Sequence, residues 1–212
     1  QQTVELEALS AIRRVLSSAT EIEGMYDYVA ERIQRIVPFD HIDIATVDLD
    51  EKRFVRRFTS GMQVEGVIEN QVGLTDGTIV EEVIRSRSLV NFQTQLGQEE
   101  TSGQWPTSLK PYLKSGLRSM AITTLVSGNI VVGVLTLASS KHGAYTLRQL
   151  DLIERLGFQL SGPMASVGER AGQIPNSREL ALLNEIARLV NSSVDIGSVY
   201  ESFALEVRKL IS

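Results

Sequence analysis

Histidine and cysteine side chains carry most metal and nucleophile chemistry, and this chain of 212 residues has two histidines and no cysteine. Without a thiol, the chain cannot form a disulfide, a thiolate nucleophile, an iron–sulfur cluster or a cysteine-ligated zinc site. A haem or metal site would depend on His41 and His142, which are far apart and lack carboxylates at ligand spacing. We therefore expect His41 at a surface turn, His142 in a polar loop, and neither as a haem or metal ligand.

A glycine-containing segment, Gly73-Leu74-Thr75-Asp76-Gly77, precedes a predicted short helix. The first N–H groups of such a helix can bind an anion. Tight turns explain both glycines as well, and we favour that interpretation. The sequence has no P-loop, no Ser/His/Asp arrangement and no convincing pair of catalytic carboxylates. An enzyme is therefore the weakest interpretation of this sequence.

Net charge and hydropathy exclude two classes of partner. The chain has 21 basic and 26 acidic residues, so its net charge of −5 gives no overall attraction to nucleic acid or anionic lipid. The longest apolar run is far shorter than the roughly 18 residues that a membrane span needs. We expect a cytoplasmic protein in which this segment contacts neither nucleic acid nor the membrane.

Hydrophobic periodicity predicts an α+β fold. Alternating apolar residues indicate one antiparallel hairpin at 41–59 and a second at 118–139. Helices are expected before the first hairpin and after Thr146, the latter kinked at Gly162-Pro163. Between the hairpins we expect a short helix at 79–84, a strand at 88–92 and a long polar connection at 93–116. Adjacent hairpins favour an antiparallel central sheet, with the terminal helices on one face.

The two ends of the chain resemble each other. Residues 5–37 align without gaps on residues 179–211, and nine of these 33 pairs are identical. Two unrelated amphipathic helix pairs would share their apolar spacing, but the matches at Ser18 and Tyr26 go beyond it. We predict a first domain at 1–170, a linker at 171–177, and a connecting helix with the truncated start of a second copy at 178–212. The chain is then a piece of a longer protein.

Residues 17–166 resemble the GAF family of small-molecule and signalling domains. The resemblance depends on the order and spacing of five segments: Phe39–Ile44, Gly73–Val80, Arg118–Ile122, Gly133–Leu137 and the helix after Tyr145-Thr146. Thr124 stands where the family often has proline. The resemblance implies a six-stranded antiparallel sheet with a helical layer on one face. It also implies a pocket on the other face, beneath a short helix and a long loop.

Tandem copies of this kind resemble the sensory region of a bacterial signalling protein. The resemblance implies a non-catalytic module of a two-component system that binds a small molecule, forms a homodimer through its terminal helices, or does both. A histidine kinase is the favoured output and a diguanylate cyclase the next. The alternative is a pure dimerisation and relay spacer without a ligand. Covalent bilin attachment and the family's methionine sulfoxide reductases need cysteine, and the Asn-Lys…Phe…Asp-Glu signature of its cyclic-nucleotide-binding members is absent.

Strand alternation and the covering segments select candidate residues for the pocket. Polar side chains on otherwise apolar strands are typical of ligand sites, although threonine is also an ordinary strand residue and Trp105 also suits an anchor for its loop. The candidates on the sheet are Asp43, Ala45, Ile122, Thr124 and Thr136, and those in the covering loop are Trp105, Tyr112 and Leu113.

Overall fold

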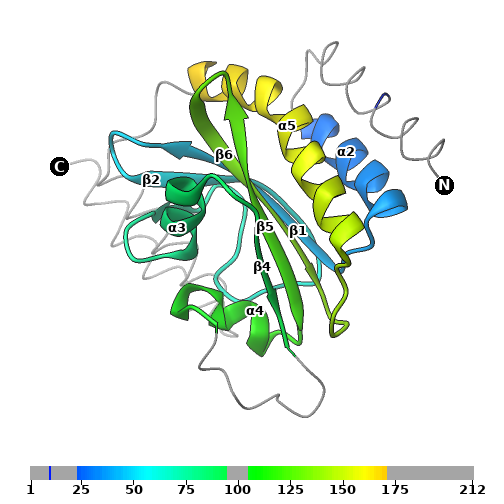
Figure 1. Ribbon diagram of the computed structural model, residues 1–212. Helices are drawn as coiled ribbons and strands as arrows, with labels where there is room; N and C mark the ends of the chain where they lie inside the picture. The colour runs from blue at the N-terminus through cyan, green and yellow to red at the C-terminus, as the bar shows by residue number, and fades with distance from the viewer. Residues whose placement is uncertain (1–9, 11–22, 95–104, 171–212) are drawn as a thin grey trace, which may run out of the picture. The chain divides into compact units, whose positions relative to one another are not determined.

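The computed structural model describes residue 10, residues 23–94 and residues 105–170 (Figure 1). In chain order, its elements are α2 (Glu23–Ile36), β1 (His41–Asp48), β2 (Arg53–Gly61), β3 (Val72–Leu74), α3 (Ile79–Ser86), β4 (Val90–Gln93), the 3-10 helix η2 (Thr107–Leu109), α4 (Lys110–Lys114), β5 (Ser119–Ser127), β6 (Ile130–Ser139) and α5 (Leu147–Arg170). The predicted linker at 171–177 and the second copy from 178 lie outside the described residues, and so does at least one member of each pair that suggested the repeat.

Six strands form one antiparallel sheet in the order β3-β2-β1-β6-β5-β4. The two predicted hairpins, β1–β2 and β5–β6, are joined at the centre of the sheet by the pairing of β1 with β6. The short strands β3 and β4 form the two edges. The predicted α+β fold with a six-stranded antiparallel sheet is confirmed.

Helices α2 and α5 cover one face of the sheet (Figure 1). Side chains of even number on β1, such as Ile42 and Ile44, point to this face and pack against Ile33 of α2 and Ile153 of α5, and all four are fully buried. Burial of each such side chain contributes roughly 1.5–3 kcal/mol to folding. Within the described part of the chain, no helix is long and apolar enough to cross a membrane. Helix α5 runs without interruption past Gly162 and Pro163.

The opposite face is covered by α3, η2 and α4, which pack on Ala45, Met120, Ile122 and Val134 of the sheet. The sequence predicted a polar connection at 93–116, and this was wrong for 107–114, which form η2 and α4. Pro111 lies in the first turn of α4. Because proline has a fixed φ and its missing N–H is not needed there, the residue starts a helix instead of preventing one.

A β-bulge at Arg57 sets the direction of the side chains along β2. Phe58 pairs with Ile44, but Ala45 pairs with Arg56, so Arg57 is an extra residue. Arg57 and Phe58 both contact the helix side: Arg57 Nε donates to Thr46 Oγ1 at 3.0 Å, and the Phe58 ring stacks on Tyr26. Arg56 and Phe54 consequently point to the opposite face, as expected when a bulge redirects a side chain.

Candidate functional site

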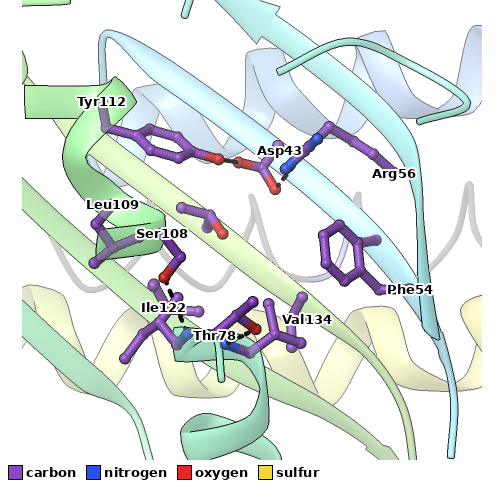
Figure 2. Close-up of a pocket in the computed structure, with 13 residues that line it drawn as sticks. Asp43, Phe54, Arg56, Thr78, Ser108, Leu109, Tyr112, Ile122 and Val134 are labelled. Atoms are coloured by element: carbon purple, nitrogen blue, oxygen red, sulfur yellow. Dashed lines mark hydrogen bonds and ion pairs between the residues drawn. The ribbon is translucent and has the colours of Figure 1, made fainter. Parts of the chain in front are cut away.

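A cavity of about 70 Å³ lies between the sheet and the segments that cover its second face (Figure 2). Seven lining residues come from strands and six from α3, η2, α4 and the residue before α3. The strand residues are Asp43, Ala45, Phe54, Arg56, Ile122, Val134 and Thr136, and the covering residues are Thr78, Ile79, Val80, Ser108, Leu109 and Tyr112.

One end of the cavity is charged. The residue Asp43 is 3% exposed, and Tyr112 Oη donates to Oδ2 of its carboxylate at 2.9 Å. Arg56 Nε lies 3.6 Å from Asp43 Oδ1, and His41 Nε2 lies 3.4 Å from Oδ2. Figure 2 shows the Asp43 carboxylate between the Tyr112 hydroxyl and the Arg56 guanidinium. An ion pair this deeply buried is tolerated because each charge is compensated by its neighbours.

The protonation states of this end follow from burial and charge. Burial alone raises the pKa of the Asp43 carboxyl, but Arg56, His41 and Tyr112 together bring that pKa below its ordinary value of 3.8. Burial, and then the charge of Asp43, raise the pKa of Tyr112 well above 10.0. Asp43 is therefore an anion at neutral pH, and Tyr112 is a neutral hydrogen-bond donor to it.

Arg56 is fixed from several sides. Its Nη1 donates to Gln71 Oε1, and the centre of its guanidinium lies 5.6 Å from the centre of the Phe54 ring. Its Nε is buried and has no hydrogen-bond partner among the residues that the structure describes. Its ion-pair distance to Asp43 is too long for a hydrogen bond, and a buried donor without a hydrogen bond costs free energy.

The histidines hold neighbouring groups in place. The expected surface position of His41 was wrong: its side chain is 1% exposed, because the bulged hairpin and the segment after β2 cover the start of β1. Its Nδ1 donates to Met62 O at 2.8 Å, and its ring lies edge-on to the Tyr112 ring. His142 Nδ1 lies 2.7 Å from Thr94 Oγ1. Among the described residues, no group of three potential metal ligands was found.

The other end of the cavity carries hydroxyl groups. Thr78 Oγ1 accepts from the Val80 N–H at 3.2 Å, and Ser108 Oγ accepts from the Ile79 N–H at 3.1 Å. The Gly77 N–H donates to the Glu81 carboxylate at 2.8 Å, and Gly77 has a positive φ. A carboxylate of the chain itself occupies the first turn of α3, which fits the turn interpretation of residues 73–77 better than an external anion site.

The structure brings five of the eight predicted residues together at the cavity: Asp43, Ala45, Tyr112, Ile122 and Thr136. The other three lie outside its lining. Trp105 packs against Phe92 of the edge strand β4, three strands away from β1. Leu113 follows Tyr112 on α4 and points about 100° away from it around the helix axis. Thr124 is buried on β5, two residues after Ile122, and it is not part of the cavity lining.

Four lining residues that carry polar or aromatic groups were not predicted: Phe54, Arg56, Thr78 and Ser108. A prediction that assumes regular alternation from Phe58 places the Arg56 side chain on the wrong face, because the bulge at Arg57 interrupts the alternation. Thr78 stands three residues before Glu81, which is capping-box spacing, and that signal could have located it. Ser108 lies in a segment that we interpreted as a loop.

Comparison with known proteins supports the architecture. No curated protein gave a significant match. Among solved structures, the chain is similar to the GAF domain of a phosphoenolpyruvate-protein phosphotransferase from Coxiella burnetii (14% identity, TM-score 0.63, covering 80% of this chain and 98% of that one). It is also similar to the GAF domain of a two-component sensor histidine kinase from Bacillus halodurans (13%, 0.61, covering 72% and 99%).

A third similar structure is the free methionine-R-sulfoxide reductase from Neisseria meningitidis, with its substrate (14%, TM-score 0.60, covering 78% of this chain and 91% of that one). At these identities the likeness shows the fold and nothing about a ligand. Residues 19–162, about two thirds of the chain, match the family model of GAF domains. The chain therefore belongs to the GAF domain family.

Proposed function

We propose that this GAF domain is a sensory module whose cavity binds a small molecule. GAF domains are generally sensory or regulatory modules without catalytic activity. The observation that supports ligand binding here is the buried pair of Asp43 and Arg56 at the cavity wall. A buried ion pair adds little stability compared with apolar packing. A charged pair at the wall of a cavity is therefore explained better by recognition of a ligand than by packing.

The covering segments give such a ligand a way to act. Tyr112 joins α4 to β1 through Asp43, and Ser108 joins η2 to α3. A ligand that bonds to Asp43 would move the carboxylate to which the Tyr112 hydroxyl donates, and would in this way shift α4. The strands β5 and β6 line the cavity with Ile122 and Val134, and α5 packs on the other face of both strands. Movement of these strands would therefore reach α5.

The output that we favour is a bacterial histidine kinase in the cytoplasm, with a diguanylate cyclase next. Support comes from the similar GAF domain of a two-component sensor histidine kinase. We propose no catalytic reaction for this segment, although one similar structure is a reductase. The hydroxyls of Thr78 and Ser108 each accept from a backbone N–H group of α3, and the hydroxyl of Tyr112 donates to Asp43.

Two-dimensional NMR of the purified chain, titrated with pools of small metabolites, tests the proposal. The expected result is a saturable shift of the resonances of Asp43, Tyr112 and Ile79, which surround the cavity. Val134→Phe, which fills the cavity, should abolish these shifts, and Arg155→Lys on the exposed side of α5 should leave them unchanged. A full metabolite screen that shifts none of these resonances contradicts ligand binding.

A second candidate function, dimerisation through α5, has its own support. Leu147 and Phe158 are 87% and 73% exposed. They are eleven residues apart, which is about three helical turns, so they lie on one face of α5. If α5 forms a dimer, sedimentation of the wild type will depend on concentration and Phe158→Lys will weaken association. The matched control is Leu74→Lys, which changes an exposed leucine on β3. A wild type that stays monomeric at all concentrations excludes this role.

A further inference from the structure

The size and charge of the cavity restrict the ligand. At about 70 Å³ it has roughly half the volume of an apolar cavity of about 150 Å³ that binds benzene. That leaves room for a group of roughly three to four non-hydrogen atoms. The charged side chains in the lining are Asp43 and Arg56, which have opposite signs. A ligand with one net charge would bury that charge without a counterion, which is costly.

The hydrogen-bonding groups at the charged end of the cavity fit a ligand that has one donor and one acceptor next to each other. Tyr112 and His41 both lie at Asp43 Oδ2, while Oδ1 faces Arg56 Nε at 3.6 Å, longer than an N–H···O hydrogen bond. Two buried nitrogens of the charged end, Arg56 Nε and His41 Nε2, have no hydrogen-bond partner among the described residues, and of these two residues Arg56 is the one that lines the cavity. An acceptor atom of the ligand would receive a hydrogen bond from Arg56 Nε, and a neighbouring donor of the ligand would bond to Asp43 Oδ1.

We propose that the cavity recognises a neutral amide edge, with the carbonyl oxygen and an N–H on the same side, as in a primary amide, a lactam or a urea. The carbonyl accepts from Arg56 Nε after a small rotation of the guanidinium, and the N–H donates to Asp43 Oδ1. Both bonds involve a charged partner and so are stronger than bonds between neutral groups. The apolar walls formed by Ile122, Val134 and Leu109 hold the remainder of the group. This inference rests on the proposed function and specifies the class of its ligand.

Three small molecules of the same shape separate the possibilities. Acetamide, acetate and acetamidinium each have four non-hydrogen atoms, and they present a donor with an acceptor, two acceptors, and two donors respectively. Each is titrated into the wild-type chain, and the Nε–Hε resonance of Arg56 and the amide resonances of Asp43 and Ile79 are followed by NMR. We expect acetamide to bind at least tenfold more tightly than either ion, with a shift of the Arg56 Nε–Hε resonance.

A variant tests the role of Nε directly. Arg56→Lys keeps the positive charge but removes the Nε donor, and it should weaken acetamide at least fivefold while changing acetate little. Arg155→Lys, a remote exposed arginine on α5, should bind acetamide like the wild type. If Arg56→Lys does not fold, the comparison of the three molecules on the wild type still decides the question.

The remaining outcomes overturn the inference. Tighter binding of acetate would assign the site to an anion, and tighter binding of acetamidinium would assign it to a cation. Equal binding of all three, or no shift at the cavity with any of them, would show that an amide edge is not recognised. If metabolite pools still shift Asp43, Tyr112 and Ile79 in these cases, the proposed sensory function survives and only the ligand class is wrong.

Discussion

Gly73 on β3 lies directly opposite Phe54 on β2, and a Cβ atom built on Gly73 would overlap the Phe54 ring. The ring therefore occupies space that any other residue at position 73 would take. The same ring lines the cavity and lies 5.6 Å from the centre of the Arg56 guanidinium. A glycine at the edge of the sheet thus controls how the charged end of the site is arranged.

Gly73→Ala should move the Phe54 ring toward the cavity. Overpacking of this kind typically costs about 1–3 kcal/mol, so we expect the free energy of unfolding in urea to fall by that amount and ligand-induced NMR shifts to weaken. The control is Gly162→Ala on α5, where an added Cβ meets nothing within 4 Å. Because alanine favours a helix by up to about 1 kcal/mol over glycine, that variant should be at least as stable as the wild type. A Gly73→Ala variant of full stability would show that the ring moves freely.

Tyr112→Phe removes the hydroxyl that donates to Asp43 Oδ2 at 2.9 Å. A buried carboxylate that loses a hydrogen bond costs about 1–3 kcal/mol, and we expect urea unfolding to show a loss in that range. Tyr28→Phe is the matched control, because Tyr28 is a half-buried tyrosine of α2, away from the cavity. Its expected change is below about 0.5 kcal/mol. Equal effects of the two substitutions would mean that the Tyr112–Asp43 bond does not stabilise the fold.

Asp40 should make stability depend on pH in the acid range. The backbone N–H of Ser140, at 2.6 Å, and then the hydroxyls of Ser140 and Ser139 keep the pKa of Asp40 below its ordinary 3.8, against the opposing effect of burial. A lowered folded-state pKa gives stability that is present above the unfolded pKa and is lost as pH falls through the folded one.

Asp40→Asn should therefore be less stable than the wild type at pH 7, and the difference should narrow as the pH falls below about 4. Urea unfolding of both proteins between pH 7 and pH 3 measures this difference. The pKa of Asp43 is also lowered, but both proteins contain Asp43, so its contribution cancels in the difference between their free energies of unfolding. A difference that stays constant with pH would rule out ionised Asp40 as the acceptor that anchors Ser139 and Ser140.

Ser108→Ala should loosen the contact between η2 and α3. It removes the Oγ that accepts from the Ile79 N–H at 3.1 Å. With about 1 kcal/mol for such a bond, hydrogen exchange of the Ile79 amide should become roughly fivefold faster. The amide of Val80, which donates to Thr78 Oγ1, provides an internal control and should keep its rate. Unchanged exchange at Ile79 would mean that backbone packing alone protects this amide.

The architecture could be predicted because it depends on patterns that repeat over many residues. The alternation in β1, β5 and β6 is regular, and each apolar residue on it supports the same pairing. The order of the two hairpins then leaves few ways to form one antiparallel sheet. Strand β3 has three residues, and its role as an edge strand is not visible in a pattern that short.

The site could be predicted only where it lies on regular strands. Asp43, Ala45, Ile122 and Thr136 follow simple alternation, and the structure places them at the cavity. Arg56 does not, because the extra residue at Arg57 interrupts the alternation of side chains along β2. The covering segments have no strand alternation from which side-chain direction can be predicted. Of the three candidates chosen there, Tyr112 lines the cavity, and Trp105 and Leu113 do not. Contacts between residues far apart in sequence, such as Tyr112 with Asp43, decide these positions.

The extra residue at Arg57 bears on how such sites diversify. Without it, the pairs of Ile44 with Phe58 and of Ala45 with Arg56 would be consecutive pairs of a regular ladder, and Phe58 and Arg56 would keep their present faces. A single deletion at position 57 would then remove the arginine that donates to Thr46, while Arg56 stayed at the cavity and the pairing order of the sheet was kept. Insertion or loss of a residue at this bulge can therefore change the side of β2 that faces the helices without changing the residues that it presents to a ligand.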